Sequence, residues 1–455
     1  MKIPLTPPRL DGLFAGLSSG GFPAVLHGQA LVRGHYLHWD QIRHRQPPED
    51  LTPEAWWLGI KLARLGLLKP LPFQDKIGRD FQFGMPDPVL ETLHDIDRQA
   101  AGHVRMALPV VSGADRDRYL VSSLIEEAVT SSQIEGASTT REVAKAMLRS
   151  GRQPADRSEQ MIFNNFQAMQ AIRELRGQAF TTELVLELHR TLTRDTLDDP
   201  SAAGRLRQPD EPIEVVDHRD GVVLHEPPAA DQLASRLQRL CQFANGEMPS
   251  PGFLHPVVRA IVLHFMLAYD HPFVDGNGRT ARALFYWSMA NAGYWLMEYI
   301  SISSLIRQAP GQYARSFLYT ETDDNDLTYF ILHQLGVIRE AIDRLHTYLQ
   351  RKMDEQQSAE RLLRTAPRLA DALNHRQVAL LSHALRHGAY GYSVASHQRS
   401  HQITQQTART DLLKLAQLGL LAQRKRGRAF VFYAPDDLRQ RIESVAVGPN
   451  DSSTT

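Results

Sequence analysis

Cysteine is almost absent from this chain, since Cys241 is the one cysteine in 455 residues. A single cysteine excludes an intramolecular disulfide and a cysteine-based zinc site, and it is typical of a reducing compartment. Net charge is absent too, because 51 basic residues balance 51 acidic ones. The whole chain therefore has no overall attraction to nucleic acid or membrane, and any such contact must come from a local patch.

Long apolar runs are also absent. The first residues, MKIPLTPPRL, lack the apolar stretch of a signal peptide. The most apolar segment, 257–269, is too short to span a membrane and carries Arg259 and His264, which predicts a buried helix. We therefore expect a cytoplasmic protein with no membrane partner. The length of 455 residues, with 42% apolar and 22% charged residues, predicts two or three globular domains.

Helical periodicity dominates the sequence, which predicts a mainly α fold. Thr52 and Pro53 are a favourable N-cap and first helical residue, and apolar residues follow them at helical spacing. Residues 1 to about 35 are rich in Gly and Pro and are expected to be irregular. Further helices are predicted over 85–102, 119–136, 159–176, 181–193, 229–245 and 256–269.

One segment departs from this helical pattern. The sequence PIEVVDHRDGVVLHEPP has β-branched residues on both sides of Asp220-Gly221, a dipeptide that favours a hairpin turn. We therefore predict a hairpin over 213–224. Two strands alone are marginally stable, so this hairpin is expected to lie against the helices.

The C-terminal quarter has a different character. Residues 346–374 are charged and predict a linker helix, and residues 376–388 and 403–419 predict two more helices. A basic hairpin that turns at Gly427 follows, with Arg424, Lys425, Arg426 and Arg428. This order predicts a winged helix-turn-helix domain over 375–440, followed by a disordered tail at 441–455. Its partner is left open between DNA, through residues 403–433, and another protein.

The glycines of DHPFVDGNGRTARAL, residues 270–284, predict an anion site. Gly276 and Gly278 permit backbone angles that let successive N–H groups converge on one point. That point lies at the N-terminus of an apolar helix, where free N–H groups and the helix dipole favour anions. Arg279 and Arg282 are three residues apart and share a helical face above the same point. Together these residues are typical of a polyphosphate site.

Two more residues of the stretch predict a reaction at that site. Asp275 offers a hard oxygen ligand, and magnesium bound to phosphates usually takes one or two protein carboxylates. His271, four residues earlier, is placed to accept a proton from an incoming nucleophile.

The stretch HPFVDGNGRTAR resembles the signature of the Fic family, H-P-F-x-[D/E]-G-N-G-R-x-x-R, at every specified position. The looser likeness of the flanking sequence extends over residues 36–345. The resemblance implies an N-terminal helical region over 1–110 and a Fic-type helical core over 111–345, with the hairpin as its flap. It also implies transfer of AMP from ATP to a Ser, Thr or Tyr hydroxyl of a target protein, and of the enzyme itself.

The resemblance assigns roles to seven residues of the stretch. His271 is implied as the general base, and Asp275 as the ligand of Mg²⁺ or Mn²⁺. Arg279 and Arg282 are implied to hold the β- and γ-phosphates of ATP. The anion nest is implied to comprise Gly276, Asn277 and Gly278. Relatives often dimerise, so a homodimer is one expected assembly.

A second motif, SSQIEG, is similar to the inhibitory motif of the family, [S/T]-x-x-x-E-[G/N], with Ser131, Glu135 and Gly136 at the specified positions. An acidic residue at the end of a helix is electrostatically misplaced. The resemblance implies an ion pair from Glu135 to Arg282, which would remove the arginine that orients the γ-phosphate. Inhibition would then be built into the same chain.

Three alternatives remain open at the level of sequence. The first is a DNA-binding regulator in which the winged helix is the working part and the Fic core is subsidiary. The second is transfer of another group, because relatives such as Doc move a phosphate and others move UMP or phosphocholine. The third is removal of AMP, with Glu135 orienting a water molecule at the same metal.

Overall fold

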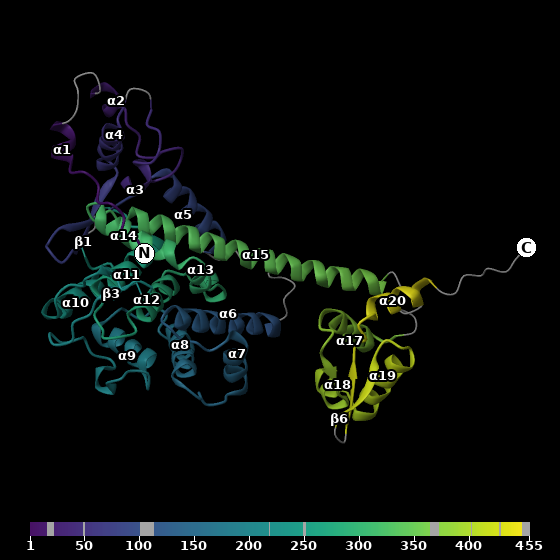
Figure 1. Cartoon of the computed structure of the whole chain (residues 1–455). Helices are drawn as coiled ribbons and strands as arrows, with labels where there is room; N and C mark the ends of the chain where they lie inside the picture. Colours follow the sequence, from purple (N-terminus) through teal and green to yellow (C-terminus); the bar gives the residue numbers. More distant parts are fainter. Residues whose placement is uncertain are drawn as a thin grey trace, which may run out of the picture. The chain divides into compact units, whose positions relative to one another are not determined.

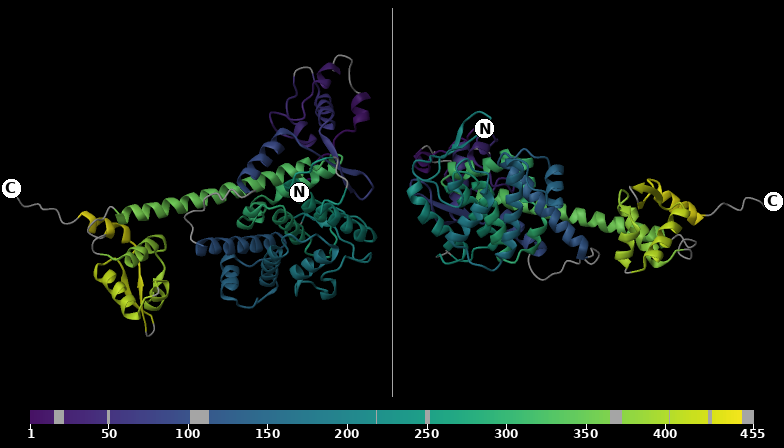
Figure 2. Two further views of the ribbon diagram at one scale, coloured as in Figure 1. Left: turned by 180° about the vertical axis from the view of Figure 1, so that it is seen from behind. Right: turned by 90° about the horizontal axis from the view of Figure 1, so that it is seen from below.

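The computed structural model divides into two compact units, Met1–Leu345 and His346–Thr455. It describes residues 1–15, 22–48, 51–100, 113–217, 219–248, 252–364, 373–401, 403–426 and 429–447. Figures 1 and 2 show that each unit is built mainly from helices, which confirms the predicted fold class.

The helices of the first unit match the predicted ones closely. The predicted N-cap Thr52 accepts a hydrogen bond from the backbone N–H of Ala55, and Pro53 is the first residue of its helix. The N-terminal segment contains two short helices, α1 and α2, where an irregular chain was predicted. The α-helices of this unit are α1 (Leu10–Ala15), α2 (Phe22–Leu26), α3 (Trp39–Ile42), α4 (Pro53–Leu65), α5 (Asp87–Ala100), α6 (Gly113–Ile134), α7 (Arg141–Ser150), α8 (Arg157–Glu174), α9 (Thr182–Thr193), α10 (Leu233–Ala244), α11 (Pro256–Asp270), α12 (Asn277–Asn291), α13 (Ile302–Gln308), α14 (Pro310–Thr322) and the start of α15 (Thr328–Arg364). The 3₁₀ helices are η1 (Pro200–Ala202), η2 (Ala230–Gln232) and η3 (Trp295–Tyr299).

The helices α11 and α12 form the centre of this unit. Both are almost completely buried, including the charged Arg279 and Arg282, because α6, α8 and α9 pack around α12. The helix α11 begins at Pro256 and ends at Asp270, and its C-cap His271 has a left-handed backbone with φ of 45°. The stretch at residues 270–284 therefore lies where the chain reverses between two buried helices.

Two antiparallel hairpins accompany the helices of the first unit. The strands β3 (Val215–Val216) and β4 (Val223–His225) form the predicted hairpin, which we call the flap. Its connection is longer than the predicted two-residue turn, because the backbone N–H of Asp217 bonds the carbonyl of Val222. The second hairpin, β1 (Leu68–Gln74) with β2 (Asp80–Gly84), lies in the N-terminal region, where only helices were predicted.

The boundary between the units falls within α15, at the position predicted for the end of the core. The predicted linker helix at 346–374 is thus continuous with the last core helix up to Arg364. The second unit then contains α17 (His375–Arg386), β5 (Gly391–Tyr392), α18 (Val394–His401), α19 (Gln405–Gln417), β6 (Ala422–Arg426), β7 (Ala429–Tyr433) and α20 (Leu438–Val447).

The second unit differs from its prediction in three places. The sequence pattern missed α18 and β5, and β5 pairs with β7 to make a three-stranded antiparallel sheet in the order β5-β7-β6. Residues 441–447 belong to α20, so the prediction of a disordered tail from 441 is wrong there. The predicted turn residue Gly427 and the basic Arg428 lie outside the described residues.

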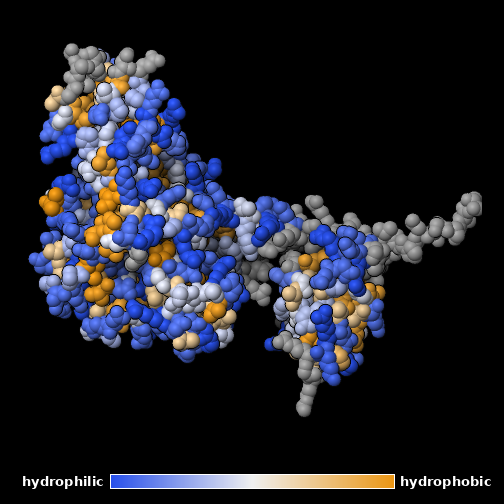
Figure 3. Space-filling view, in the orientation of Figure 1, coloured by the Kyte–Doolittle hydropathy of each residue, from blue (hydrophilic) through white to orange (hydrophobic). Residues whose placement is uncertain are grey.

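The surfaces in Figure 3 are largely hydrophilic, with apolar residues gathered in places on the first unit. In the described part of the chain, no helix is long and apolar enough to cross a membrane.

Candidate active site

The turn between α11 and α12 brings the predicted site residues together. His271 and Gly276 have left-handed backbones, with φ of 45° and 82°. A side chain at Gly276 would also collide with Thr193, since a Cβ there would lie 2.8 Å from the Thr193 methyl carbon. The sequence therefore needs glycine at this position to bring the chain sharply onto the N-terminus of α12.

Hydrogen bonds from two buried side chains brace this turn. Asn277, predicted as part of the anion nest, uses its side-chain amide to bond both the N–H and the carbonyl of Phe273, at 2.9 and 2.8 Å. His189 stacks on the Phe273 ring with centroids 3.7 Å apart, and its Nε2 bonds the carbonyl of Asp275 at 2.9 Å. Sequence reasoning missed His189, whose position in a regular helical stripe gave no signal of its distant partner.

The protonation of His189 follows from its partners. Its Nδ1 accepts from the backbone N–H of Gly204, so Nε2 carries the hydrogen that Asp275 accepts. Burial lowers the pKa of His189 to about 4, which agrees with a neutral ring. A neutral His189 therefore fixes the backbone beside the predicted metal ligand.

His271 has the geometry of a general base. Its Nδ1 lies 3.1 Å from the carbonyl oxygen of Ala268, which can only accept, so Nδ1 carries the hydrogen and Nε2 keeps its lone pair. Burial lowers the pKa of His271, although the Ala268 carbonyl and the charge of Glu135 oppose that shift. The ring is thus neutral at pH 7 and can accept a proton at Nε2.

Arg282 is bound to the predicted inhibitory residues. Its Nη2 lies 2.9 Å from Glu135 Oε1, and its Nε donates to the Ser131 hydroxyl at 2.8 Å. The side chain of Arg282 is 2% exposed and that of Glu135 is 23% exposed, so the ion pair is largely shielded from water. Burial alone would lower the pKa of Arg282, but Glu135, Tyr313 and Glu127 together raise that pKa.

Glu135 also lies over the N-terminus of α12. The helix α6 ends at Ile134, and Gly136, with φ of 96°, turns the chain immediately after Glu135. A Cβ added at Gly278 would overlap the Glu135 carboxylate, so this carboxylate rests against the backbone of the predicted nest. The carboxylate thus occupies the place in which an anionic ligand would meet both the N–H groups and Arg282.

Arg279 has partners that differ from the predicted phosphates. Its side chain is fully buried, with Nη1 donating to the carbonyl of Leu192 at 3.0 Å and Nη2 lying 3.4 Å from Asp275. Its Nε is a buried nitrogen without a partner. In this arrangement Arg279 joins α12 to the end of α9 and orients Asp275.

Asp275 is the exposed carboxylate of the site, with 38% of its side chain accessible. No group of three or more His, Cys, Asp or Glu that could hold a metal occurs among the described residues. A single accessible carboxylate nevertheless fits a magnesium ion whose other ligands are phosphates and water. The donor set therefore fits a metal that arrives with a nucleotide and does not fit a permanent protein-held metal.

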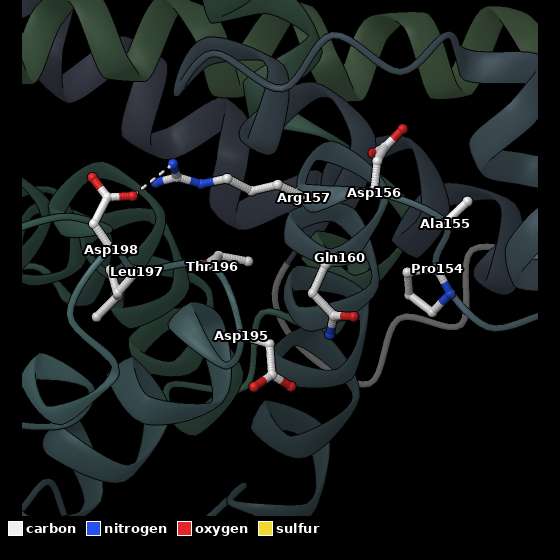
Figure 4. Close-up of a pocket in the computed structure, with 9 residues that line it drawn as sticks. All are labelled: Pro154, Ala155, Asp156, Arg157, Gln160, Asp195, Thr196, Leu197 and Asp198. Atoms are coloured by element: carbon white, nitrogen blue, oxygen red, sulfur yellow. Dashed lines mark hydrogen bonds and ion pairs between the residues drawn. The ribbon is translucent and has the colours of Figure 1, made fainter.

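A polar pocket is lined by Arg157, which also approaches Asp275, and Figure 4 shows the residues that line this pocket. It encloses about 290 Å³ between the start of α8 and the loop after α9. Arg157 lies at its edge, 3.0 Å from Asp198 and 3.9 Å from Asp275. Arg157 therefore connects this pocket to Asp275.

The flap is tied to the same turn by His225. Its Nε2 lies 2.7 Å from the carbonyl of Tyr269, and its Nδ1 lies 2.7 Å from the carboxylate of Glu321. Both partners are hydrogen-bond acceptors. Arg207 adds a bond to the carbonyl of His271 at 3.0 Å. These contacts, which sequence reasoning also missed, hold the flap close to His271.

Buried polar residues support the helix α6. Glu127, two helical turns before Glu135, accepts from the hydroxyls of Tyr286 and Ser301 at 2.9 and 2.7 Å. Tyr313 contacts Arg282 from the other side, and burial raises the pKa of Tyr313 to about 12. The ion pair between Glu135 and Arg282 is therefore held in register by a preformed polar network.

The turn between α11 and α12 falls within a recognisable family domain. Residues 179–289 match the family model described as Fic/DOC family. The chain therefore contains a Fic/DOC domain, which includes the whole turn from His271 to Arg282.

Named relatives agree with this assignment. The chain is 38% identical over 114 residues to the protein adenylyltransferase Fic of Drosophila virilis, which is 25% of this chain and 21% of that protein. The counterpart from Drosophila melanogaster is also 38% identical over 114 residues, 25% of this chain and 20% of that protein. The chain thus spans about a fifth of the length of these curated relatives.

A solved structure shares the fold over a longer stretch. A Fic family protein from Desulfovibrio desulfuricans aligns with 80% of this chain and 99% of its own, with a TM-score of 0.53 and 18% identity. This likeness supports the fold alone.

Proposed function

We propose that this protein transfers AMP from ATP to a hydroxyl group of a protein, and that Glu135 keeps it inactive. The observation that carries the proposal is the juxtaposition of a neutral His271 with a free Nε2 and the N-terminus of α12, where Glu135 holds Arg282. A base beside an anion nest with an arginine is what phosphoryl-group transfer requires.

The chain's own residues supply positioning and charge. The backbone N–H groups at Gly276, Asn277 and Gly278 would hold the phosphates, and Arg282 would orient the γ-phosphate once Glu135 has left it. The target hydroxyl gives its proton to Nε2 of His271 as its oxygen bonds the α-phosphorus. The bond from the α-phosphorus to the bridging oxygen breaks, and pyrophosphate leaves. A tyrosine, serine or threonine hydroxyl satisfies this step equally.

Asp275 would hold Mg²⁺ or Mn²⁺ that arrives with the nucleotide. The metal, when bound, neutralises charge on the phosphates. Arg279 would orient Asp275 for this role, since it lies 3.4 Å from Asp275 and is itself fixed by its bond to the carbonyl of Leu192. We therefore assign Arg279 to the positioning of Asp275, in addition to the predicted attraction for phosphates.

The flap would dock the target segment by strand addition. Its sheet has two strands, so each strand has an outer edge whose backbone groups can pair with an extended peptide. The contacts of His225 with Tyr269 and Glu321 set the distance between the flap and His271. A docked hydroxyl would thereby reach the base.

Glu135 would inhibit in two ways. It neutralises Arg282, and its carboxylate lies against Gly278, in the volume that the phosphates need. ATP would then bind only with its γ-phosphate displaced and its α-phosphorus out of line with the hydroxyl.

Label transfer tests the proposed activity. The full-length Glu135→Gly variant is incubated with a cell lysate and ATP labelled at either the α- or the γ-phosphate. We expect label that depends on His271 from α-labelled ATP alone, so that adding His271→Ala to the variant removes it. Label from γ-labelled ATP that likewise depends on His271 would show phosphate transfer and overturn the proposal. Loss of label from a pre-modified protein after ATP is removed would reveal removal of AMP at the same site.

A further inference from the structure

The second unit is rich in positive charge, although the chain as a whole is neutral. Between Asn374 and Tyr433 the sequence contains nine Lys and Arg residues and a single acidic residue, Asp411, although the whole chain has 51 of each sign. Such a local excess of positive charge attracts polyanions over about a Debye length, roughly 8–10 Å at physiological salt.

The acidic Asp411 does not reduce the surface charge, because it lies inside the unit. It is 3% exposed and accepts from the Arg376 guanidinium at 2.8 Å, from the Asn374 amide at 2.8 Å and from His397 Nε2 at 3.2 Å. These bonds join the start of α17 and the middle of α18 to α19. Asp411 therefore orients α19, and its negative charge is paired with Arg376 inside the unit.

The helices α18 and α19 have the spacing of a helix-turn-helix. α18 ends at His401 and α19 begins at Gln405, so three residues connect them. Thr404 caps α19 by accepting from the N–H of Thr407. The β6–β7 hairpin follows, and Figure 1 shows it beside α19 within this unit. This order of helices and hairpin is that of DNA-binding winged helices.

The exposed face of α19 is polar throughout. Residues Ala408, Asp411, Leu412 and Leu415 are buried, which leaves a face that meets solvent on the opposite side. Its exposed residues are Gln405, Gln406, Arg409, Thr410, Lys414 and Gln417. Gln and Arg are the side chains that bond adenine and guanine edges in the major groove.

We propose that the second unit binds duplex DNA, with the exposed face of α19 in the major groove and the β6–β7 hairpin against the phosphate backbone. On the hairpin, Arg424 and Lys425 are exposed in the strand β6. Phosphate contacts from such side chains supply affinity, and α19 supplies contacts to bases. A docking surface for a protein would be expected to have an apolar centre, which the exposed face of α19 does not provide.

Salt-dependent binding of the full-length protein tests the proposal. A short fluorescent duplex of mixed sequence is titrated with protein at a series of NaCl concentrations, and anisotropy gives Kd. We compare the wild type with Arg424→Glu/Lys425→Glu and with Arg409→Glu. The matched control is Lys69→Glu/Arg98→Glu, which changes the same charge at exposed positions of the first unit. All substituted residues are exposed, and circular dichroism checks that each variant is folded.

The expected wild-type Kd is on the order of micromolar near physiological salt, with log Kd rising steeply with log salt. Replacing the two hairpin cations should weaken binding at least about tenfold and reduce the salt slope by about 1.8, since each phosphate contact contributes about 0.9. Arg409→Glu should weaken binding likewise, while the control keeps the wild-type Kd. Absence of binding at low salt, or equal losses in the control and the hairpin variant, would overturn the proposal. Absence of binding would favour a protein partner for this unit.

Discussion

Replacement of Glu135 by glycine should activate the enzyme. The substitution removes the carboxylate that lies 2.9 Å from Arg282 and against the backbone of Gly278. It leaves α6 intact, because Glu135 follows the last residue of that helix and the buried bonds of Glu127 still anchor it. The change therefore acts on the nest and not on the fold.

The expected size of this activation follows from the ion pair. Two unit charges 2.9 Å apart attract by about 6 kcal/mol at an effective dielectric constant of 20. Desolvation of both groups offsets much of this, and a hydrogen bond between charged groups contributes about 1.5–3 kcal/mol net. If ATP must overcome that amount, its productive binding is about 10- to 150-fold weaker in the wild type. We therefore expect self-modification to increase at least about tenfold in the variant.

The assay measures the initial rate of self-modification at saturating and at limiting ATP. Glu135→Gln is the matched control, since it keeps the volume and an acceptor for Arg282 but removes the charge. We expect rates in the order wild type, Glu135→Gln, Glu135→Gly. The double variant Glu135→Gly/Arg282→Ala should return to the inactive level, because the freed arginine is then missing.

Unchanged activity in Glu135→Gly would refute this reasoning. So would full activity in the double variant, because Arg282 would then have no role in orienting ATP. A Glu135→Gln rate equal to that of Glu135→Gly would assign inhibition to charge alone and exclude the steric contribution at Gly278.

Further predictions address four single residues. In the activated background, His271→Ala should lower the rate of transfer about a hundredfold or more while Kd for ATP, measured by calorimetry, stays similar. Because burial lowers the pKa of His271, the rate should stay level down to about pH 6.5 and fall at lower pH as the base is protonated. Asp275→Ala should reduce the dependence of the rate on magnesium concentration, and unchanged dependence would place the metal elsewhere. His189, with a folded pKa of about 4, stabilises the fold above pH 6.5 and loses that contribution as the pH falls towards 4. Urea unfolding of the wild type should therefore lose about 2 kcal/mol more between pH 7 and pH 5 than that of His189→Asn. Arg279→Ala should destabilise the protein by about 2 kcal/mol or more in thermal unfolding without ATP, because a buried carbonyl loses its donor; an unaltered melting temperature would return Arg279 to phosphate binding alone.

The stretch at residues 270–284 and the helices on either side of it could be predicted from local sequence. Gly276 dictates a sharp turn because its backbone has φ of 82° and a Cβ there would collide with Thr193, and the helices on either side follow from their apolar periodicity. The pairing of Glu135 with Arg282 was predicted from the family resemblance, and the structure places the two side chains 2.9 Å apart. Their role in inhibition stays a prediction.

Other features depend on contacts between residues distant in the chain. His189 and Arg207 sit in ordinary sequence, and their importance arises from bonds to Asp275 and His271 that no periodicity reveals. The β1–β2 hairpin was missed because it follows α4 directly and has a Pro-rich first strand. The helix α18 was missed because its sequence, VASHQRSH, has almost no apolar stripe. Burial around Asp411 stabilises it instead.

The mass of the modified protein tests the central proposal most directly. Purified Glu135→Gly protein is incubated with ATP and magnesium beside Glu135→Gly/His271→Ala, and intact-mass spectrometry measures the adduct on each. We predict a gain of one or more AMP groups on the first protein and no gain on the second. A gain of phosphate alone, or an equal gain of AMP on both proteins, would contradict AMP transfer with His271 as the base.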